Sequence, residues 1–246
     1  MVVAIIQARM GASRLPGKVL MDIEGVPLLQ YQLQRIAKSK RLEKVVVATS
    51  VAKQDDQIDV FCRQHSIECF RGPENDVLSR YYECAKKYKA DIIVRLTADC
   101  PFSDPAVIDN VIWLLGDKKA DYAANTVQPE TSHFPDGFDV EVFSMQALKR
   151  ANLEAIDPHD REHVTFYFWK YQNGFRVEQL FYPKNYSKYR VTVDYPEDIQ
   201  VARLIAQELK KTKKFGTMEE VIEILNFNPE IKEINSHYYF GIGWKK

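Results

Sequence analysis

The sequence opens with Val2-Val3-Ala4-Ile5-Ile6, an apolar run that leads into Ala8-Arg9-Met10-Gly11-Ala12-Ser13-Arg14-Leu15-Pro16-Gly17-Lys18. The run has the length and the β-branched residues of a buried strand. The eleven residues from 8 to 18 contain two glycines, one proline, three cations and no acid. The glycines let the backbone turn tightly beside a ligand, and the proline stiffens the turn. The stretch therefore predicts a phosphate-binding loop at the carboxyl end of a first strand, where open α/β sheets place their ligands.

The cations of this loop, Arg9, Arg14 and Lys18, suit the oxygens of a polyphosphate. Two better-known phosphate loops do not fit. In a Walker A loop four residues separate the glycines, whereas five residues separate Gly11 from Gly17, and Val19 stands where the metal-binding hydroxyl belongs. The dinucleotide fingerprint G-x-G-x-x-G is also absent. A solvated basic loop with no ligand is the alternative at this point.

Composition limits the classes of protein. The chain has 246 residues, of which 46% are hydrophobic and 28% charged, so a sizeable core under a polar surface is expected. Lys plus Arg equals Asp plus Glu at 34 each. Zero net charge argues against binding to nucleic acid or to a membrane surface, because both depend on a positive field.

The cysteines and the absence of long apolar segments indicate a cytoplasmic protein. The four cysteines contain no C-x-x-C pair, which favours reduced thiols. The N-terminal apolar run is too short for a signal peptide and lacks a basic prelude. No segment approaches the roughly 20 apolar residues that cross a bilayer.

Short apolar runs alternate with helical patterns in the first half of the chain. Strand, helix and strand at this spacing indicate parallel pairing with right-handed crossovers. The predicted fold class is α/β, a Rossmann-like three-layer α/β/α arrangement with a mainly parallel sheet. The expected strands after the first are 45–48, 67–70 and 92–96, and the expected helices are 29–36, 58–62, 78–88 and 105–115.

The pattern changes after residue 125. Residues 126–137 are polar and contain two prolines, which predicts a long functional or mobile loop. Residues 138–143 and 189–193 alternate like half-exposed strands, expected as antiparallel additions to the sheet. Between them, apolar and aromatic residues at 164–171 predict a helix that packs in the core or at a subunit interface. We expect a single domain over 1–246, with 126–192 as an insertion for sugar binding and dimerisation.

Two aspartates stand where a metal site would need them. Asp99 follows the predicted strand 92–96, which places it on the same rim as the basic loop, and Asp194 follows the predicted strand 189–193. Mg²⁺ prefers one or two carboxylates together with phosphate oxygens and water. Structural alternatives remain for both: Asp99 as a turn or capping residue, and Asp194 as the N-cap of a helix that opens at Pro196.

The first loop, A-R-x-G-[SA]-x-R-[LF]-P-x-K after an N-terminal strand, resembles the signature of bacterial sugar cytidylyltransferases. These include synthetases of CMP-activated 3-deoxy-manno-octulosonate and of CMP-sialic-type acids. The whole chain looks most like the branch named for spore-coat polysaccharide biosynthesis protein F. The resemblance implies a nucleotide-diphospho-sugar transferase-like fold and a magnesium-dependent transfer of CMP from CTP to a sugar, expected to be a 2-keto sugar acid. It also implies release of pyrophosphate, a role in cell-surface or spore-coat polysaccharide biosynthesis, and a homodimer.

The resemblance also assigns roles to residues. Asp99 and Asp194 match the metal aspartates of the family, and Lys18, Arg14 and Asp99 are the predicted catalytic residues. Lys18 would neutralise the α-phosphate, while Arg9 and Arg14 would hold the phosphates that leave. The segment 71–81 faces the base and ribose in this branch, although Arg80 also suits a surface helix and Asp76 an N-cap. The predicted nucleotide-binding residues are Ala8, Arg9, Gly11, Ser13, Arg14, Lys18, Arg71 and Arg80.

The predicted sugar site comes from the second half of the chain. Asp139 and Glu141 lie on one face of a predicted strand and are candidates for sugar hydroxyls. Arg161 and His163 belong to a segment that resembles R-E-H-V of the spore-coat branch, and they are candidates for the carboxylate of the sugar acid. Helix capping and surface ion pairs explain this polar cluster equally well.

Two other functions stay open from the sequence. A glycosyltransferase that uses a nucleotide-sugar donor has a similar fold, and Asp139-Val140-Glu141 loosely imitates its D-x-D metal motif. The basic first loop suits a triphosphate better than a diphosphate, which argues against this alternative. A non-catalytic nucleotide-binding protein is the other, and the two placed aspartates argue against it.

Overall fold

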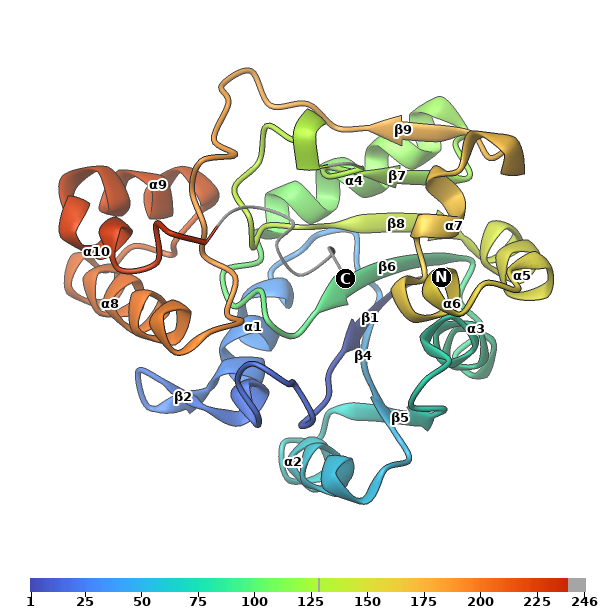
Figure 1. Ribbon diagram of the computed structural model, residues 1–246, viewed down its shortest axis with the longest axis horizontal. Coiled ribbons are helices and arrows are strands. Elements are labelled where there is room, and N and C mark those ends of the chain that lie inside the picture. The colour runs from blue at the N-terminus through green and yellow to red at the C-terminus, as the bar shows by residue number, and fades with distance from the viewer. Residues whose placement is uncertain (128, 239–246) are drawn as a thin grey trace.

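A sheet of seven strands runs through the computed structural model, which describes residues 1–127 and 129–238 (Figure 1). The strands lie in the order β5-β4-β1-β6-β8-β7-β9, so the first strand of the chain is in the interior of the sheet. β5, β4, β1 and β6 are parallel neighbours, as expected for strand–helix–strand units. Their bounds are Val2–Gln7 for β1, Lys44–Ser50 for β4, Glu68–Gly72 for β5 and Ile92–Thr97 for β6.

Three further strands extend the sheet beyond β6. β8 (Glu141–Ser144) pairs antiparallel with β6 and with β7 (Tyr122–Ala124), and β9 (Val177–Gln179) pairs parallel with β7. The predicted fold class is confirmed: the sheet is mainly parallel with an antiparallel addition. The sequence does not predict β7 and β9, because three residues are too few to show a period. A small hairpin of β2 (Asp22–Ile23) and β3 (Val26–Pro27) stands apart from this sheet.

Helices cover both faces of the sheet. Along β1, Ala4 and Ile6 pack into one hydrophobic cluster, and Val3 and Ile5 pack into the other. Burial on both faces explains why β1 reads as a continuous apolar run. The first cluster lies under α1 (Leu28–Ile36), α2 (Asp56–Gln64), α4 (Pro105–Lys118), α8 (Pro196–Thr212), α9 (Met218–Phe227) and α10 (Pro229–Glu233). The second lies under α3 (Val77–Lys87), α5 (Met145–Glu154) and α7 (Phe166–Trp169).

The predicted strand 189–193 is wrong. This segment is extended, but it makes only an isolated bridge between Arg190 and Asp136. Its N–H groups donate to two different loops: Val191 to the carbonyl oxygen of Asp136 at 2.8 Å, and Val193 to that of Asp99 at 2.8 Å. Because the partners belong to separate loops, no regular ladder forms.

The continuous helix predicted over 164–171 is also wrong. α6 (Pro158–His163) ends at His163, and Val164 has a φ of +62°, through which a helix of L-residues cannot continue. α7 then supplies one further turn. Its Phe168 is buried and stacks on Tyr122 and Phe143 at 5.3 Å between ring centroids, as core packing requires.

The rim of the sheet determines where the loops meet. At the carboxyl ends of the parallel strands, Gln7 of β1 is the register partner of both Thr97 of β6 and Ala48 of β4. The loops that follow β1 and β6 therefore leave the sheet side by side. Among the described residues, no helix has both the length and the apolar character to span a bilayer.

Candidate active site

A glycine turn closes the loop after β1. Gly17 has a φ of +74°, and its N–H donates to the carbonyl oxygen of Met10 at 2.9 Å. A residue with a Cβ would be strained at this φ. The N–H of Met10 in turn donates to Oδ1 of Asp55 at 2.7 Å, which ties the loop to the segment after β4. The loop thereby fixes the position of Lys18, which follows the turn.

Lys18 is buried beneath this loop, and only 8% of its side chain is exposed. Its Nζ donates to Oδ2 of Asp99 at 3.0 Å, to Oδ1 of Asp194 at 2.8 Å and to the carbonyl oxygen of Val193 at 2.7 Å. All three protons of the ammonium group thus have acceptors in the protein. The loop after β1, the loop after β6 and the segment before α8 meet at this one nitrogen.

Opposite charges keep this buried cluster ionised. Burial disfavours a charged Lys18, but Asp99 and Asp194 outweigh it, so the pKa of Lys18 is raised. Burial likewise disfavours a charged Asp99, yet the adjacent Lys18 lowers the pKa of Asp99 to about 2. The carboxylate of Asp99 is therefore in the form that binds cations at neutral pH.

The residues present fit a magnesium ion bound together with phosphates. The ammonium group of Lys18 stands between the two carboxylates, so this point already accepts a positive charge. The described part of the chain contains no group of three or more His, Cys, Asp and Glu side chains that could hold a metal ion by themselves. Two carboxylates, with the other positions left to phosphate oxygens and water, are the donor set that Mg²⁺ prefers. Asp99 and Asp194 are the residues that would hold it.

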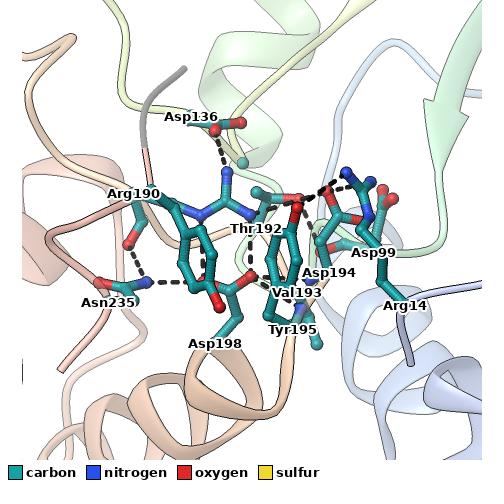
Figure 2. Close-up of polar contacts among 12 residues, drawn as sticks. Arg14, Asp99, Asp136, Arg190, Thr192, Val193, Asp194, Tyr195, Asp198 and Asn235 are labelled. Atoms are coloured by element: carbon teal, nitrogen blue, oxygen red, sulfur yellow. Dashed lines mark hydrogen bonds and ion pairs between the residues drawn. The ribbon is translucent and has the colours of Figure 1, made fainter. Parts of the chain in front are cut away.

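Arg14 contacts the second carboxylate oxygen of Asp194 (Figure 2). Its Nη2 is 2.9 Å from Oδ2 of Asp194, and its Nη1 donates to the hydroxyl of Tyr195 at 3.3 Å. The guanidinium carbon lies 4.9 Å from the centroid of the Tyr195 ring, within cation–π range. Asp194 is therefore bracketed by Lys18 on one oxygen and Arg14 on the other.

Two cavities adjoin at these aspartates. The first, of about 150 Å³, is called the basic cavity here; it is lined by Gln7, Arg9, Ala12, Ser13, Arg14, Lys18, Val19, Thr97, Ala98, Asp99 and Asp194. The second, of about 200 Å³, is called the acidic cavity; it is lined by Arg14, Arg95, Thr97, Asp99, Cys100, Thr126, Asp136, Asp139, Glu141, His163, Thr165, Phe166, Trp169, Arg190, Thr192 and Asp194. Four residues line both cavities: Arg14, Thr97, Asp99 and Asp194. The two aspartates therefore lie where the cavities meet.

The acidic cavity has more carboxylates than arginines, and all three of its arginines, including Arg14 at Asp194, are already paired. Arg95 forms a close ion pair with Glu141, which also accepts a hydrogen bond of 2.7 Å from the hydroxyl of Tyr122. Arg190 contacts Asp136 at 2.6 Å. Burial, with smaller contributions from the carboxylates of Glu141 and Asp99, raises the pKa of Asp139 to about 6. The cavity therefore suits a ligand that is rich in hydrogen-bond donors.

A model of one protein family matches almost the whole chain. The family is described as cytidylyltransferase, and the match covers residues 3–230. The chain belongs to the cytidylyltransferase family. It is 33% identical over 233 residues to the spore coat polysaccharide biosynthesis protein SpsF of Bacillus subtilis, a match that covers 92% of this chain and 94% of the relative. The predicted resemblance to sugar cytidylyltransferases is thereby confirmed, and the chain is a CTP-dependent nucleotidyltransferase.

Solved structures agree with this family. A cytidylyltransferase from Leptospira borgpetersenii superimposes with a TM-score of 0.87 at 31% identity, covering 97% of this chain and 99% of that one. CMP:2-keto-3-deoxy-manno-octonic acid synthetase, in complex with CTP, superimposes with a TM-score of 0.62 at 21% identity, covering 85% of this chain and 99% of that one. At that identity the second likeness concerns the fold alone. Both support the nucleotide-diphospho-sugar transferase-like fold.

The structure brings most of the predicted loop residues of this cytidylyltransferase together. Arg9, Ser13, Arg14 and Lys18 line the basic cavity. Ala8 and Gly11 do not line it and instead shape the loop. The N–H of Ala8 donates to the carbonyl oxygen of Ala48 at 3.2 Å. Gly11 packs so closely on Gln54 that an added Cβ would lie 2.6 Å from its Nε2.

The predicted base-binding arginines lie elsewhere. Arg71 is held by Asp56 at 2.7 Å and by the carbonyl oxygens of Ser50 and Ala52. Arg80 is buried and donates to the carbonyl oxygen of Pro73 at 3.0 Å, and its Nε has no hydrogen-bond partner among the residues that the structure describes. Neither side chain lines the basic or the acidic cavity. Asp76 is the N-cap of α3, accepting from the N–H of Ser79 at 3.0 Å, which is the structural alternative for this residue.

The predicted sugar residues separate into two groups. Asp139, Glu141 and His163 line the acidic cavity. Arg161 does not; its Nε and Nη2 both contact Oδ2 of Asp76, at 3.0 and 2.8 Å, and it ties α6 to α3. Because Glu141 is engaged by Arg95 and Tyr122, Asp139 and Glu141 do not form the metal pair of a D-x-D motif.

Several residues that line the two cavities were not predicted from the sequence. Gln7 and Thr97 end their strands on the rim, which a rule for strand ends would have found. Arg95 and Arg190 lie inside segments read as strands, where a charged residue facing a cavity looks like one facing solvent. The N-cap of α8 is Tyr195 and not Asp194, so the alternative role of Asp194 as an N-cap is wrong.

Proposed function

We propose that this enzyme joins the CMP of CTP to the anomeric hydroxyl of a sugar, a 2-keto sugar acid, and releases pyrophosphate. The observation that carries the proposal is the position of Lys18, whose ammonium group lies between Asp99 and Asp194 where the basic and acidic cavities meet. The name of one relative supports a product used in polysaccharide synthesis: it is a spore coat polysaccharide biosynthesis protein. We assign this enzyme to cell-surface polysaccharide biosynthesis, in the cytoplasm.

The basic cavity is the proposed site of the triphosphate. Arg9, Arg14 and Lys18 line it, and Ala98 and Ser13 complete its wall. Guanidinium groups and an ammonium group hold phosphate oxygens by charge-assisted hydrogen bonds. Fixed positive groups also stabilise charge that grows on the leaving pyrophosphate without reorganising during the reaction.

The acidic cavity is the proposed site of the sugar. Its carboxylates accept hydrogen bonds from hydroxyl groups, and Phe166 and Trp169 offer aromatic faces for the apolar side of a ring. The attacking hydroxyl would approach the α-phosphorus across the two shared aspartates, with the α–β bridging bond breaking on the opposite side. Arg14 lines both cavities, which makes it the cation within reach of the carboxylate of the acid as well as of phosphate.

We propose Mg²⁺ as the metal, held by Asp99 and Asp194. When bound, it would supply Lewis-acid stabilisation to the phosphates. The residues around it act by position: Lys18 neutralises the α-phosphate, and Arg14 keeps Asp194 oriented until the ion arrives.

One assay tests the proposed function. The protein is incubated with each nucleoside triphosphate, Mg²⁺ and a panel of sugar acids and neutral sugars, and pyrophosphate is measured. The expected result is release that requires CTP, a sugar acid and the metal together. Release of pyrophosphate with neutral sugars only would mean that the acceptor is a neutral sugar and not a sugar acid. Hydrolysis of a UDP-sugar without release of pyrophosphate would favour a glycosyltransferase.

We also propose a homodimer. Leu153, Ile156 and Tyr171 lie within the predicted 126–192 insertion and have exposed fractions of 72%, 91% and 98%. Covering exposed apolar side chains with a second copy of the chain would favour association. Light scattering on the purified protein measures its mass directly, and a monomeric mass at assay concentrations would contradict the dimer.

A further inference from the structure

Arg190 lies on the wall of the acidic cavity, but its donors face protein carboxylates (Figure 2). Its Nε donates to Oδ1 of Asp198 at 3.0 Å and its Nη2 to Oδ2 of Asp198 at 2.8 Å, a bidentate pair. Its Nη1 donates to Oδ2 of Asp136 at 2.6 Å, and Nη2 is also 3.7 Å from Oδ2 of Asp194. Only 7% of the side chain is exposed. The guanidinium group therefore has little freedom to turn toward a ligand.

Asp198 joins Arg190 to the backbone that carries Asp194. Besides the bond from Arg190, its Oδ2 accepts the N–H of Asp194 at 2.9 Å and the N–H of Tyr195 at 3.0 Å. Its Oδ1 accepts from Nδ2 of Asn235 at 2.8 Å. The side chain of Asp198 is fully buried, and Asp198 lines neither the basic nor the acidic cavity. Its role is confined to holding the start of α8, directly after Asp194.

Asp136 joins Arg190 to the loop on the far wall of the cavity. The carbonyl oxygen of Asp136 accepts the N–H groups of Val191 at 2.8 Å and Thr192 at 3.2 Å. At the next residue, Gly137, an added Cβ would lie 2.5 Å from the backbone nitrogen of Thr192. The end of the long polar loop and the segment that leads to Asp194 are thus in direct backbone contact, with Arg190 bonded across them.

We propose that Arg190 is a positioning residue, which holds the carboxylate of Asp194 in place for the metal and does not bind the sugar. This inference rests on the metal site proposed above. Asp198 accepts the backbone N–H of Asp194, whereas the carboxylate of Asp194 is contacted by cations, which are Lys18, Arg14 and Arg190. Lys18 and Arg14 also line the basic cavity, the proposed site of the triphosphate, whereas Arg190 does not.

The competing role for Arg190 is direct contact with the carboxylate of a sugar acid, since it is a cation on the cavity wall. The two roles differ in what a substitution changes. A positioning residue acts on metal binding and on kcat, because an error of about 1 Å in a reacting group costs on the order of 100-fold in rate. A direct ligand of the sugar acts on the KM for the sugar and leaves metal binding unchanged.

The test compares Arg190→Lys with wild-type protein in two measurements. Mn²⁺ binding is followed by electron paramagnetic resonance in the presence of α,β-methylene-CTP, with the complex of metal and nucleotide alone subtracted. Steady-state kinetics use Mg²⁺, CTP and 3-deoxy-manno-octulosonate, or the panel sugar that the wild-type enzyme accepts. We expect at least a roughly 10-fold weaker Mn²⁺ affinity, a kcat at least roughly 10-fold lower, and a sugar KM within about 3-fold of wild type. Arg203→Lys, an exposed arginine on α8, is the matched control and should change none of these.

Asp198→Asn supplies a second test, because this residue cannot touch a ligand in either cavity. It keeps the shape of the side chain and weakens its hold on Arg190, so it should lower Mn²⁺ affinity and kcat in the same direction. Circular dichroism melts identify any variant that does not fold, and the other variant then decides. Unchanged Mn²⁺ affinity in a folded variant, or a raised sugar KM with normal kcat, overturns the positioning role. Failure of the wild-type protein to bind Mn²⁺ would instead remove the proposed metal site.

Discussion

The ammonium nitrogen of Lys18 donates a hydrogen bond of 2.8 Å to Oδ1 of Asp194, a residue 176 positions later in the chain. Asp99, 81 positions after Lys18, accepts from the same nitrogen at 3.0 Å. This contact joins the phosphate-binding loop to both predicted metal ligands. The ammonium group of Lys18 also places a positive charge between the two carboxylates. The first prediction concerns the removal of this charge.

Replacing Lys18 with alanine should lower the rate of pyrophosphate release by about 1,000-fold. A pair of unit charges about 4 Å apart is worth about 4 kcal/mol at an effective dielectric constant of about 20, and each 1.4 kcal/mol of barrier is tenfold in rate. The variant also leaves Asp99 and Asp194 facing each other without the buried ammonium group. Its melting temperature should therefore rise with Mg²⁺ more than that of wild type. Ordinary turnover in Lys18→Ala would remove this residue from the mechanism, and Lys38→Ala, on the exposed surface, is the control.

Arg9 and Arg71 were both predicted to bind the nucleotide, but the structure places them differently. Arg9 lines the basic cavity, whereas Arg71 is paired with Asp56 outside it. Arg9→Ala should raise the KM for CTP by about tenfold or more, since it removes a charge-assisted contact worth roughly 1.5–3 kcal/mol. Arg71→Ala should leave the KM for CTP within about twofold. Equal effects of the two substitutions would show that the nucleotide extends toward Arg71.

Asp139 should make the folded protein less stable at neutral pH than an asparagine would. Burial raises the pKa of Asp139 to about 6, so the folded state binds this proton more tightly than the unfolded chain does. Stability therefore falls as the pH rises from about 4 to about 6, by at most about 3 kcal/mol for a shift of this size. Asp139→Asn should show a higher melting temperature at pH 7 and no difference from wild type below about pH 4. Its use of the sugar should fall, because the cavity loses a charged acceptor. A difference in melting temperature that does not depend on pH would contradict the assigned pKa.

Gly137 should be intolerant of any side chain. It has a φ of +108°, and an added Cβ would lie 2.5 Å from the backbone nitrogen of Thr192. Gly137→Ala should therefore destabilise the protein by about 2 kcal/mol or more and separate the acidic cavity from Asp194. Gly116→Ala is the matched control: Gly116 is inside α4, nothing lies within 4 Å of its added Cβ, and the change should be neutral or stabilising by up to about 1 kcal/mol. Urea unfolding of both variants measures the difference.

Local signals predicted much of the fold. The apolar run at the start of the chain became β1 in the interior of the sheet, and the helical pattern that opens at Pro105 became α4. Elements of three residues escaped prediction, as did the break at Val164, because positive φ in a β-branched residue has no signature in the sequence. The alternation at 189–193 suggested a strand, but its backbone partners belong to two loops.

The candidate site divides in the same way. Lys18 and Asp99 were placed at one rim by the rule that parallel strands end on the same side, and the structure has them in contact. The pairing of Arg190 with Asp136 and Asp198 depends on which loop crosses which, and residue type alone does not determine this. Arg71 and Arg161 show the converse case, in which the residue type suits a ligand but the side chain is used elsewhere. Asp56 holds Arg71, and Asp76 holds Arg161.

The sequence alone determined the alternation of strands and helices in the first half of the chain, the glycine turn before Lys18 and the chemical type of the residues predicted to handle phosphate and metal. These depend on backbone freedom, periodic burial and charge, which act over a few residues. Only the tertiary structure decided which carboxylates share the ammonium group of Lys18 and which arginines stay bonded to the protein. Those outcomes depend on distances between segments far apart in the chain, and distance determines whether a charge faces a ligand or another side chain.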